Sequence, residues 1–334
     1  MLTEKKFNLI IVLGIFAFSL IGYVINEPYF ITLATKIVIL GIAGCALNLI
    51  LGFGGMVSFG HAMFFGVGSY VAAISAFHSM NGESINLIFF DFNGSNQMLF
   101  NWFLAVIFSM FFALIVGSIS IRTSGVYFIM ITLAFAQMTY YFSVGWTKYG
   151  GEDGLSTYVR NDLFSINTML PLNFFIICFA CLCVVGFILN WVINSNFGNF
   201  LKGCKENEEK MISLGLNPYT LKLTAFVISG AITGLAGALY VDLNRFVSPT
   251  SLSWQTSGEL IVLVILGGSA RLFGPLLGAI VFILLEQFLG EVTENWQFWL
   301  GVILVLIVLY FPKGVSGLLS LIHISEPTRR LNIS

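Results

Sequence analysis

The sequence predicts an all-α integral membrane protein, a polytopic helix bundle of about ten spans within a range of eight to ten. Hydrophobic residues make up 57% of the 334 residues and charged residues only 9%, whereas a soluble globular chain carries roughly 25% charged residues. The mean hydropathy is +0.93. This much apolar surface excludes a soluble enzyme and a disordered protein. The net charge of −1 argues against a nucleic-acid binder.

The apolar runs define the spans in order. A membrane span needs about 20 residues, and the runs cover residues 7–25, 30–51, 57–79, 99–120, 125–146, 170–193, 223–241, 256–269, 275–290 and 296–312. The first run is too long for a signal peptide and lacks a small-residue cleavage site. The eighth and ninth runs are short. They are either two tilted spans or the glycine-rich broken halves of a re-entrant hairpin.

Basic residues set the orientation. With both termini cytoplasmic, the inner segments hold nine basic residues and the outer segments three, which fits the positive-inside rule. The inner ones are Lys5, Lys6, Arg122, Lys202, Lys205, Lys210, Lys222, Arg271 and Lys313, and the outer ones are Lys148, Arg160 and Arg245. Lys36 falls within a span, and Asp242, Glu259 and Glu286 lie at or near span ends.

The chain divides into one transmembrane domain, residues 1–319, and a tail, residues 320–334. The tail is polar, lacks periodicity and follows the last span. It is either a disordered cytoplasmic end or a non-native scar from cloning, and we favour the scar.

A glycine-rich segment, Gly52–His61, joins the second and third spans. Glycine permits close helix approach and non-helical backbone at membrane depth. A polar group there is a functional candidate by default, so we single out Ser58 and His61 with Gly54 and Gly55. In the alternative interpretation His61 only bonds a neighbouring carbonyl. The pairs Gly230/Gly234 and Gly274/Gly278 are expected simply to pack helices closely.

Two loops carry further candidates. On the outer side, Gly150 and Gly151 adjoin Glu152 and Asp153. This is either a structured turn that meets an external partner or substrate, or a solvated loop. On the inner side, the loop of about residues 194–222 predicts a short amphipathic helix. Its partial apolar stripe is Leu201, Met211, Ile212 and Leu214, and its polar candidates are Glu206, Asn207, Glu208 and Glu209.

Within that inner loop, Glu206 and Lys210 have the i, i+4 spacing of a helical ion pair, and Gly215 suits a helix C-terminus. The helix either lies on lipid or docks into a cytosolic partner. The three glutamates disfavour anionic lipid, so we favour the partner.

No catalytic or nucleotide-binding motif is present, so we expect neither an enzyme nor a cofactor. The sequence lacks a Walker A motif, an H-E-x-x-H motif and a G-x-S-x-G motif. Cys178, Cys181 and Cys183 are spaced like part of a metal site, but no histidine lies near them in sequence. We interpret them as small packing residues and predict no metal.

At these segments the sequence resembles the LivM-type permease family of branched-chain amino acid ABC importers. The first matching stretches are Leu47–Gly55, Ser58–Ala62 and Gly150–Leu155. Others are Arg122–Ala134, Phe197–Gly215, Ala225–Gly230, Gly234–Gly237, Phe246–Pro249, Gly267–Pro275 and Phe311–Gly314. The resemblance covers residues 30–318 in the family's order. Met56 stands where relatives usually have glutamine and Tyr149 where they usually have threonine, departures that bear on the translocation path and the substrate class.

The resemblance implies a permease in a bacterial inner membrane. Its implied partners are two cytosolic ABC ATPase subunits, a LivH-like second permease subunit, and a periplasmic or lipid-anchored solute-binding protein. Gly54, Gly55, Ser58 and His61 would then lie near the translocation pathway. Gly150, Gly151 and Asp153 would face the binding protein. Glu206, Asn207, Glu208, Glu209 and Gly215 would form the loop that couples to the ATPases.

The sequence alone leaves other functions open. An ABC permease for urea or short amides shares most of these motifs. An ion-coupled secondary transporter would need intramembrane carboxylates, and none is predicted at mid-span. An integral-membrane enzyme would need a catalytic constellation, which the sequence lacks.

Overall fold

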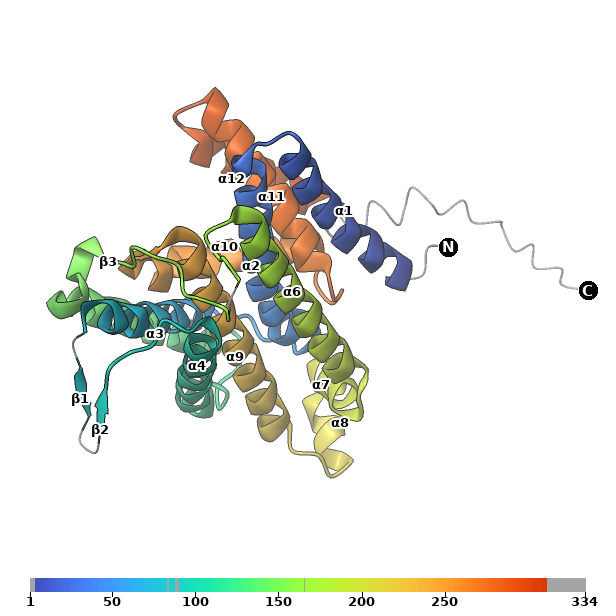
Figure 1. Ribbon diagram of the computed structural model, residues 1–334. Coiled ribbons are helices and arrows are strands. Elements are labelled where there is room, and N and C mark those ends of the chain that lie inside the picture. The colour runs from blue at the N-terminus through green and yellow to red at the C-terminus, as the bar shows by residue number, and fades with distance from the viewer. Residues whose placement is uncertain (1–3, 83, 88–89, 165, 311–334) are drawn as a thin grey trace, which may run out of the picture.

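The computed structural model describes residues 4–82, 84–87, 90–164 and 166–310. Its helices are α1 (Glu4–Val24), α2 (Pro28–Asn48), α3 (His61–Asn81), α4 (Met98–Ser120), α5 (Val126–Val144), α6 (Pro171–Asn194), α7 (Asn196–Glu206), α8 (Glu208–Ser213), α9 (Pro218–Asn244), α10 (Trp254–Gly267), α11 (Gly274–Val292) and α12 (Trp296–Tyr310). Figure 1 shows them gathered into one bundle. The predicted tail and Lys313 lie outside the described residues.

Short strands and turns connect the helices. Strands β1 (Ile85–Leu87) and β2 (Phe90–Phe92) form an antiparallel hairpin, and β3 (Leu155–Ser156) pairs antiparallel with β4 (Phe246–Val247). A π-helix, Leu49–Phe53, extends α2, and 3₁₀ turns cover Thr147–Tyr149, Gly151–Asp153 and Pro249–Leu252.

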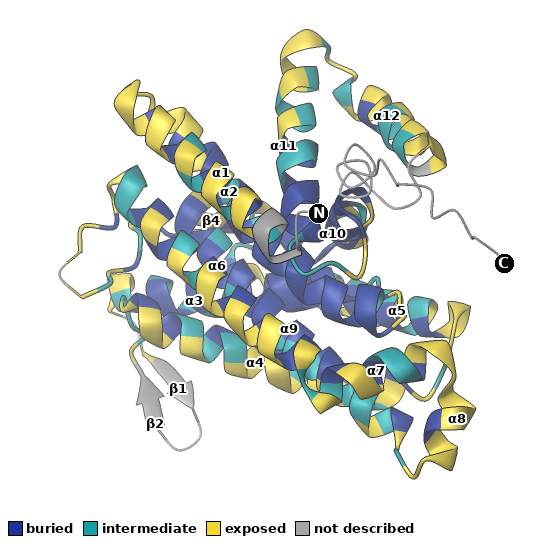
Figure 2. Cartoon of the chain, turned by 90° about the vertical axis from the view of Figure 1, so that its right-hand side faces the viewer, coloured by how far each residue is buried: buried dark blue, intermediate teal, exposed yellow. Residues whose placement is uncertain are grey.

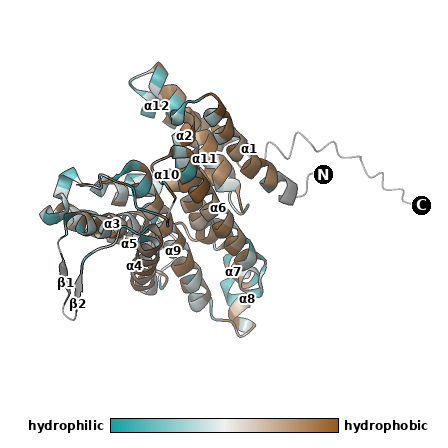
Figure 3. Ribbon diagram, in the orientation of Figure 1, coloured by the Kyte–Doolittle hydropathy of each residue, from teal (hydrophilic) through white to brown (hydrophobic). Residues whose placement is uncertain are grey.

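The predicted all-α membrane bundle is confirmed. Seven helices in the described part of the chain are long and apolar enough to span a membrane, namely α2 with its π extension, α3, α4, α5, α6, α9 and α11. Three shorter apolar helices are Asn8–Val24 within α1, α10, and Trp296–Ile307 within α12. Figure 3 shows the apolar character along these helices and the polar character of α7 and α8.

The loops segregate to opposite ends of the bundle. At one end, which we call the α7 end, Lys205 bonds the Gly52 carbonyl, Tyr219 bonds the Ser118 carbonyl and Asn48 bonds the Arg271 carbonyl. At the other end, which we call the hairpin end, β3 pairs with β4 and the Met98 N–H donates to the Asp162 carbonyl. The ends of α2 and α4 that carry Asn48 and Ser118 therefore lie at the same end of the bundle as the start of α9.

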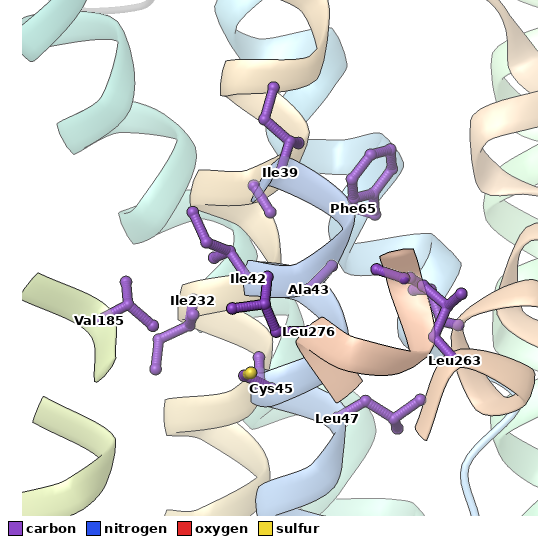
Figure 4. Packing of buried hydrophobic residues seen from close by; sticks show 14 of the residues in the cluster. Ile39, Ile42, Ala43, Cys45, Leu47, Phe65, Val185, Ile232, Leu263 and Leu276 are labelled. Atoms are coloured by element: carbon purple, nitrogen blue, oxygen red, sulfur yellow. The ribbon is translucent and has the colours of Figure 1, made fainter. Parts of the chain in front are cut away.

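The core lies where α2, α3 and α9 meet. Figure 2 shows the buried residues concentrated on these helices, whereas the faces of α4, α6 and α12 are mostly exposed. Figure 4 shows side chains of α2 packed among those of α6, α9, α10 and α11, including Ile39, Ile42, Cys45, Val185, Ile232, Leu263 and Leu276. The exposed apolar faces of the outer helices are those that would meet lipid.

Glycines bring the central helices into backbone contact. A Cβ on Gly68 of α3 would collide with the carbonyl group of Gly234 in α9, and one on Gly278 of α11 would collide with the Leu263 carbonyl of α10. The Ser69 hydroxyl donates to the Gly237 carbonyl at 2.9 Å across the α3–α9 contact. The small-residue packing expected for the pairs that contain Gly234 and Gly278 is present.

Substituting Gly68 by alanine should destabilise the bundle by about 1–3 kcal/mol, because the new methyl group meets backbone that cannot rotate away. Thermal unfolding of the purified protein in detergent would measure the loss. Gly301→Ala in α12 is the matched control, since no atom lies within 4 Å of its added Cβ. Equal melting temperatures for the two variants would contradict this account of the α3–α9 contact.

Candidate functional site

The end of α2 is wound into the π-helix Leu49–Phe53 before the chain leaves helical geometry. The Gly54 N–H donates to the Leu49 carbonyl at 3.1 Å, and the Met56 N–H donates to the Ile50 carbonyl at 2.9 Å. Gly55 has a φ of +71°, a left-handed conformation that glycine adopts without steric cost. Single π-helical turns are rare and recur at functional sites. The local backbone therefore supports the choice of this segment as a candidate site.

His61 is the first residue of α3 and is completely buried. Its Nε2 lies 2.8 Å from Ser229 Oγ, and its Nδ1 lies 3.3 Å from Ser58 Oγ. The Ser229 hydroxyl itself donates to the Ala46 carbonyl at 2.5 Å. Ser229 therefore accepts a hydrogen bond from His61, which assigns the proton to Nε2 and leaves Nδ1 to accept from Ser58.

The surroundings of His61 are aromatic and dry. Phe64 and Phe226 meet its ring edge to face, with ring centroids 5.4 and 5.7 Å away. Through its two ring nitrogens His61 ties the start of α3 to α9 and, by way of Ser229, to α2. Its partners are two hydroxyl groups and not the neighbouring carbonyl that the simpler interpretation expects. Ser58 and His61 are sealed within the bundle, whereas Gly55 is exposed.

Asn48, in the last turn of α2, holds the turn between α10 and α11. Its Nδ2 donates to the Arg271 carbonyl at 2.7 Å, and its Oδ1 accepts from the Ala270 N–H at 3.0 Å. The side chain of Asn48 is 1% exposed. Polar groups of a helix break at membrane depth need such a partner, because lipid offers none. The adjacent Gly52 has no room for a side chain, since a Cβ would collide with Asn48 Oδ1 and the Ala270 nitrogen.

Helix α7 is docked onto the π-helix by two lysines. Lys205 Nζ donates to the Gly52 carbonyl at 2.7 Å, and a Cβ on Gly55 would come within 2.8 Å of Lys205 Cγ. Lys202 Nζ lies 5.5 Å from the centroid of the Phe53 ring, within the range of a cation–π interaction. The α7 end thus joins α7, the π-helix and the α10–α11 turn into one hydrogen-bonded unit.

The predicted amphipathic helix is in fact two helices that meet at Asn207. The Asn207 side chain accepts from the Lys210 N–H at 2.9 Å and so caps α8. The predicted ion pair between Glu206 and Lys210 is wrong, because this break puts the two residues on different helices. Instead Glu208 pairs with Lys222 of α9. An Asn N-cap stabilises a helix start by about 1 kcal/mol, which explains why the backbone breaks there.

Helix α8 ends at Ser213, and Gly215 forms its C-terminal cap as predicted, with a φ of +81°. The Gly215 N–H donates to the Ile212 carbonyl at 2.8 Å and the Leu216 N–H donates to the Met211 carbonyl at 3.1 Å, which is a Schellman motif. Met211 faces inward, but Ile212 and Leu214 are 59% and 68% exposed. The tip of α8 therefore projects two large apolar side chains, together with exposed Glu206 and Glu209.

The outer glycine loop is a structured turn at the hairpin end. Gly150 has a φ of +90°, and a Cβ there would collide with the Gly154 carbonyl. Tyr149, which stands where relatives usually have threonine, is buried, and its hydroxyl lies 2.9 Å from His78 Nε2. Gly151 is buried, whereas the carboxylates of Glu152 and Asp153 are exposed. The loop thus has a rigid backbone that presents acidic side chains outward.

A second polar cluster holds the loop that follows. Arg160 Nε donates to the Asp242 carbonyl and Nη1 to the Thr168 carbonyl, each at 2.7 Å. Asn161 Nδ2 donates to Asp242 Oδ1 at 2.7 Å. Burial, and after it the charge of Arg245, lowers the pKa of the Arg160 guanidinium. These bonds fix Arg160, Asn161 and Thr168 on the end of α9.

A cavity of about 590 Å³ lies in the hairpin-end half of the bundle. Helices α2, α3, α5, α9, α10, α11 and α12 and the Pro249–Leu252 turn all contribute to its wall. Three side chains that carry a charge at neutral pH line it, Lys36 of α2, Glu259 of α10 and Glu286 of α11. Lys36 Nζ lies 3.1 Å from Glu286 Oε2 and 3.3 Å from Oε1. The volume is within the usual range for a small-molecule site.

The candidates of the glycine-rich segment lie near the inner loop, whereas those of the Gly150–Asp153 turn lie far from both. Gly55 adjoins Lys205 of the inner loop, and Gly54, Ser58 and His61 lie close to Gly55 along the chain. Gly150, Gly151 and Asp153 lie at the opposite end. Sequence interpretation missed Asn48 and Ser229 as partners of these segments. Their signal was a polar residue within an apolar run, which by itself names no partner.

Comparisons with known proteins agree with this architecture. The protein family described as "Branched-chain amino acid transport system / permease component" matches residues 29–311. The high-affinity branched-chain amino acid transport system permease protein LivM of Salmonella typhimurium is 26% identical over 330 residues, covering 90% of this chain and 74% of the relative. LivM of Escherichia coli is 25% identical with the same coverage. No solved structure matches the chain.

A more distant relative matches only part of the chain. The probable branched-chain amino acid transport permease protein LivM of Methanocaldococcus jannaschii is 28% identical over 144 residues, covering 37% of this chain and 40% of the relative.

Replacing Asn48 by alanine should lower the free energy of unfolding by about 1–3 kcal/mol, because it removes a buried carboxamide and leaves the Ala270 N–H and the Arg271 carbonyl without their partner. Thermal unfolding in detergent measures the change. The matched control is Asn190→Ala in α6, where the side chain is exposed and bonds only Asn194. If both variants melted together, Asn48 would not be holding the α10–α11 turn.

Proposed function

The chain belongs to the family of branched-chain amino acid transport permeases, and from that premise we propose that it is the transmembrane permease subunit of an ATP-driven ABC importer for branched-chain, hydrophobic amino acids. One observation carries the proposal beyond the family. Helices α7 and α8 form a polar projection with an exposed apolar tip, docked on the broken end of α2. Such an element suits the docking of a separate, force-generating subunit.

We place the α7 end in the cytoplasm and the hairpin end outside a bacterial inner membrane. Lys202, Lys205, Lys210, Lys222 and Arg271 all lie at the α7 end, as the positive-inside rule requires of the cytoplasmic side. Asp153 and Glu152 then face the exterior, where a periplasmic or lipid-anchored solute-binding protein would dock on the rigid Gly150–Gly151 turn.

The partners follow from what a permease of this kind lacks. The sequence contains no Walker A motif, so two cytosolic ABC ATPase subunits would supply ATP hydrolysis. A LivH-like second permease subunit would form the other half of the pathway. We assign ATPase docking to the α8 tip, with Glu206, Glu208, Glu209 and Gly215 shaping its surface and its C-terminus.

The hydrogen bonds at the α7 end offer a route for coupling. Movement of α7 would be passed by Lys205 to the Gly52 carbonyl, and the π-helix would pass it through Asn48 to the α10–α11 turn. Helices α10 and α11 in turn line the outer cavity. Alternating access would then be a rigid-body change between two packings. Gly54, Gly55, Ser58 and His61 lie beside this hinge, and we place the inner part of the pathway there.

One uptake experiment tests the proposal and distinguishes it from two other functions. We expect uptake of labelled leucine by cells that carry the complete gene cluster, and we expect it to need this chain and ATP. Uptake of labelled urea in place of leucine would keep the architecture and change the substrate. Uptake that survives ATP depletion but collapses with the proton or sodium gradient would make the protein an ion-coupled secondary transporter.

Substitutions should separate the docking of the ATPase subunits from the transmission of their movement to the bundle. Ile212→Ser with Leu214→Ser removes the apolar tip, so the ATPase subunits should no longer co-purify with the permease. Lys205→Met keeps the aliphatic stem but loses the bond to Gly52, so the ATPases should remain bound while leucine uptake falls at least tenfold relative to ATP hydrolysis.

Lys210→Met is the control for the Lys205 variant, because Lys210 is exposed and its side chain makes no hydrogen bond or ion pair within the described residues. Normal uptake in the Lys205 variant would exclude the proposed route through the π-helix. Normal co-purification in the tip variant would place ATPase docking elsewhere.

A further inference from the structure

The outer cavity contains ionisable groups that the coupling route does not use. Lys36 lies eight residues beyond Pro28, about 12 Å along α2 from its outer end. Its ion pair with Glu286 leaves both side chains partly accessible, at 32% and 29% exposure. Glu259 lines the same cavity, and within the described residues its side chain makes no hydrogen bond or ion pair of its own. One cation and two carboxylates therefore share this space.

These charges are not needed to close the bundle. Many of the contacts among α2, α10 and α11 are apolar or made through glycine, and an ion pair at membrane depth costs desolvation energy that apolar residues would avoid. Ionisable residues within spans generally mark a substrate or ion pathway. The partial exposure of Lys36 and Glu286 means that a solute in the cavity can reach both charges.

We propose that this cavity is a solute subsite that recognises the charged backbone of an α-amino acid. The ammonium group binds between Glu259 and Glu286, and the carboxylate group binds Lys36. Leu40, Phe65 and Phe282 line the same cavity and receive an apolar side chain. This inference rests on the proposed import function, and it makes the permease itself selective, in addition to any binding protein.

The arrangement of charge selects among solute classes. A zwitterion exchanges the Lys36–Glu286 contact for two new charge-assisted bonds and supplies a partner to Glu259, so no charge loses a partner when it binds. Urea and short amides carry no charge and leave the Glu259 carboxylate unpaired. An amine without a carboxylate satisfies the glutamates but offers nothing to Lys36. The site therefore favours solutes that carry both groups.

The test uses the complete transporter with its binding protein, reconstituted in proteoliposomes and assayed for labelled leucine uptake. Glu259→Gln keeps the shape of the side chain and removes only its charge. We expect at least a tenfold rise in the leucine concentration that gives half-maximal uptake, with assembly and basal ATP hydrolysis unchanged. Glu291→Gln, five residues beyond Glu286 in α11 and outside the cavity lining, is the control and should transport normally.

A charge-swapped variant, Lys36→Glu with Glu286→Lys, separates recognition from structure. The swap keeps the ion pair but reverses the charges that the solute meets, so uptake should remain at least tenfold impaired while the melting temperature stays near the original. Wild-type uptake by both the swap and Glu259→Gln would overturn the subsite. Absence of leucine uptake by the unmodified transporter would instead overturn the import function on which the subsite rests.

Discussion

The Asn48 carboxamide is the contact on which the α7 end of the structure depends. Two helical segments, α2 and the α10–α11 pair, break at neighbouring points, and each break leaves backbone groups without a partner in their own helix. Asn48 satisfies a donor and an acceptor of the α10–α11 turn at once, and Lys205 satisfies the Gly52 carbonyl. Because each break is satisfied by a side chain from another element, none of the three elements can shift without displacing the next.

The centre of the bundle, where α2, α3 and α9 meet, is held by more direct contacts than the α7 end. His61, Ser229 and the Ala46 carbonyl form a continuous chain across α3, α9 and α2, and Gly68 and Gly234 bring the α3 and α9 backbones together. These contacts are short and buried, and two of them involve backbone. The bundle therefore has a tightly packed centre of α2, α3 and α9. The α10–α11 pair is held at its connecting turn and lines the cavity at its other end.

Much of the fold could be predicted from the sequence because a single property, apolarity over the length of a span, decides it. The apolar runs, the glycine pairs and the Gly215 helix end were all local signals. Two kinds of feature were not local. The Asn207 break competes with a plausible longer helix and is decided by a side-chain cap. The partners of Asn48 and Lys36 lie 222 and 250 residues away, and one sequence without covariation contains no signal for such pairs.

The position of the carboxylates also bears on what kind of transporter this is. A coupling-ion site needs to be near the midplane, where it can face each side in turn. Glu259 lies five residues from the start of α10, and Glu286 lies six residues from the end of α11, so both belong to the hairpin-end half, which we propose to be the outer one. A cation bound there would not cross the bundle by a change at the inner turn alone. On the proposed import mechanism, the pair is better placed to select a solute on entry, while the energy for its passage would come from the opposite end through α7. That division of tasks is the one expected of a permease driven by separate ATPases.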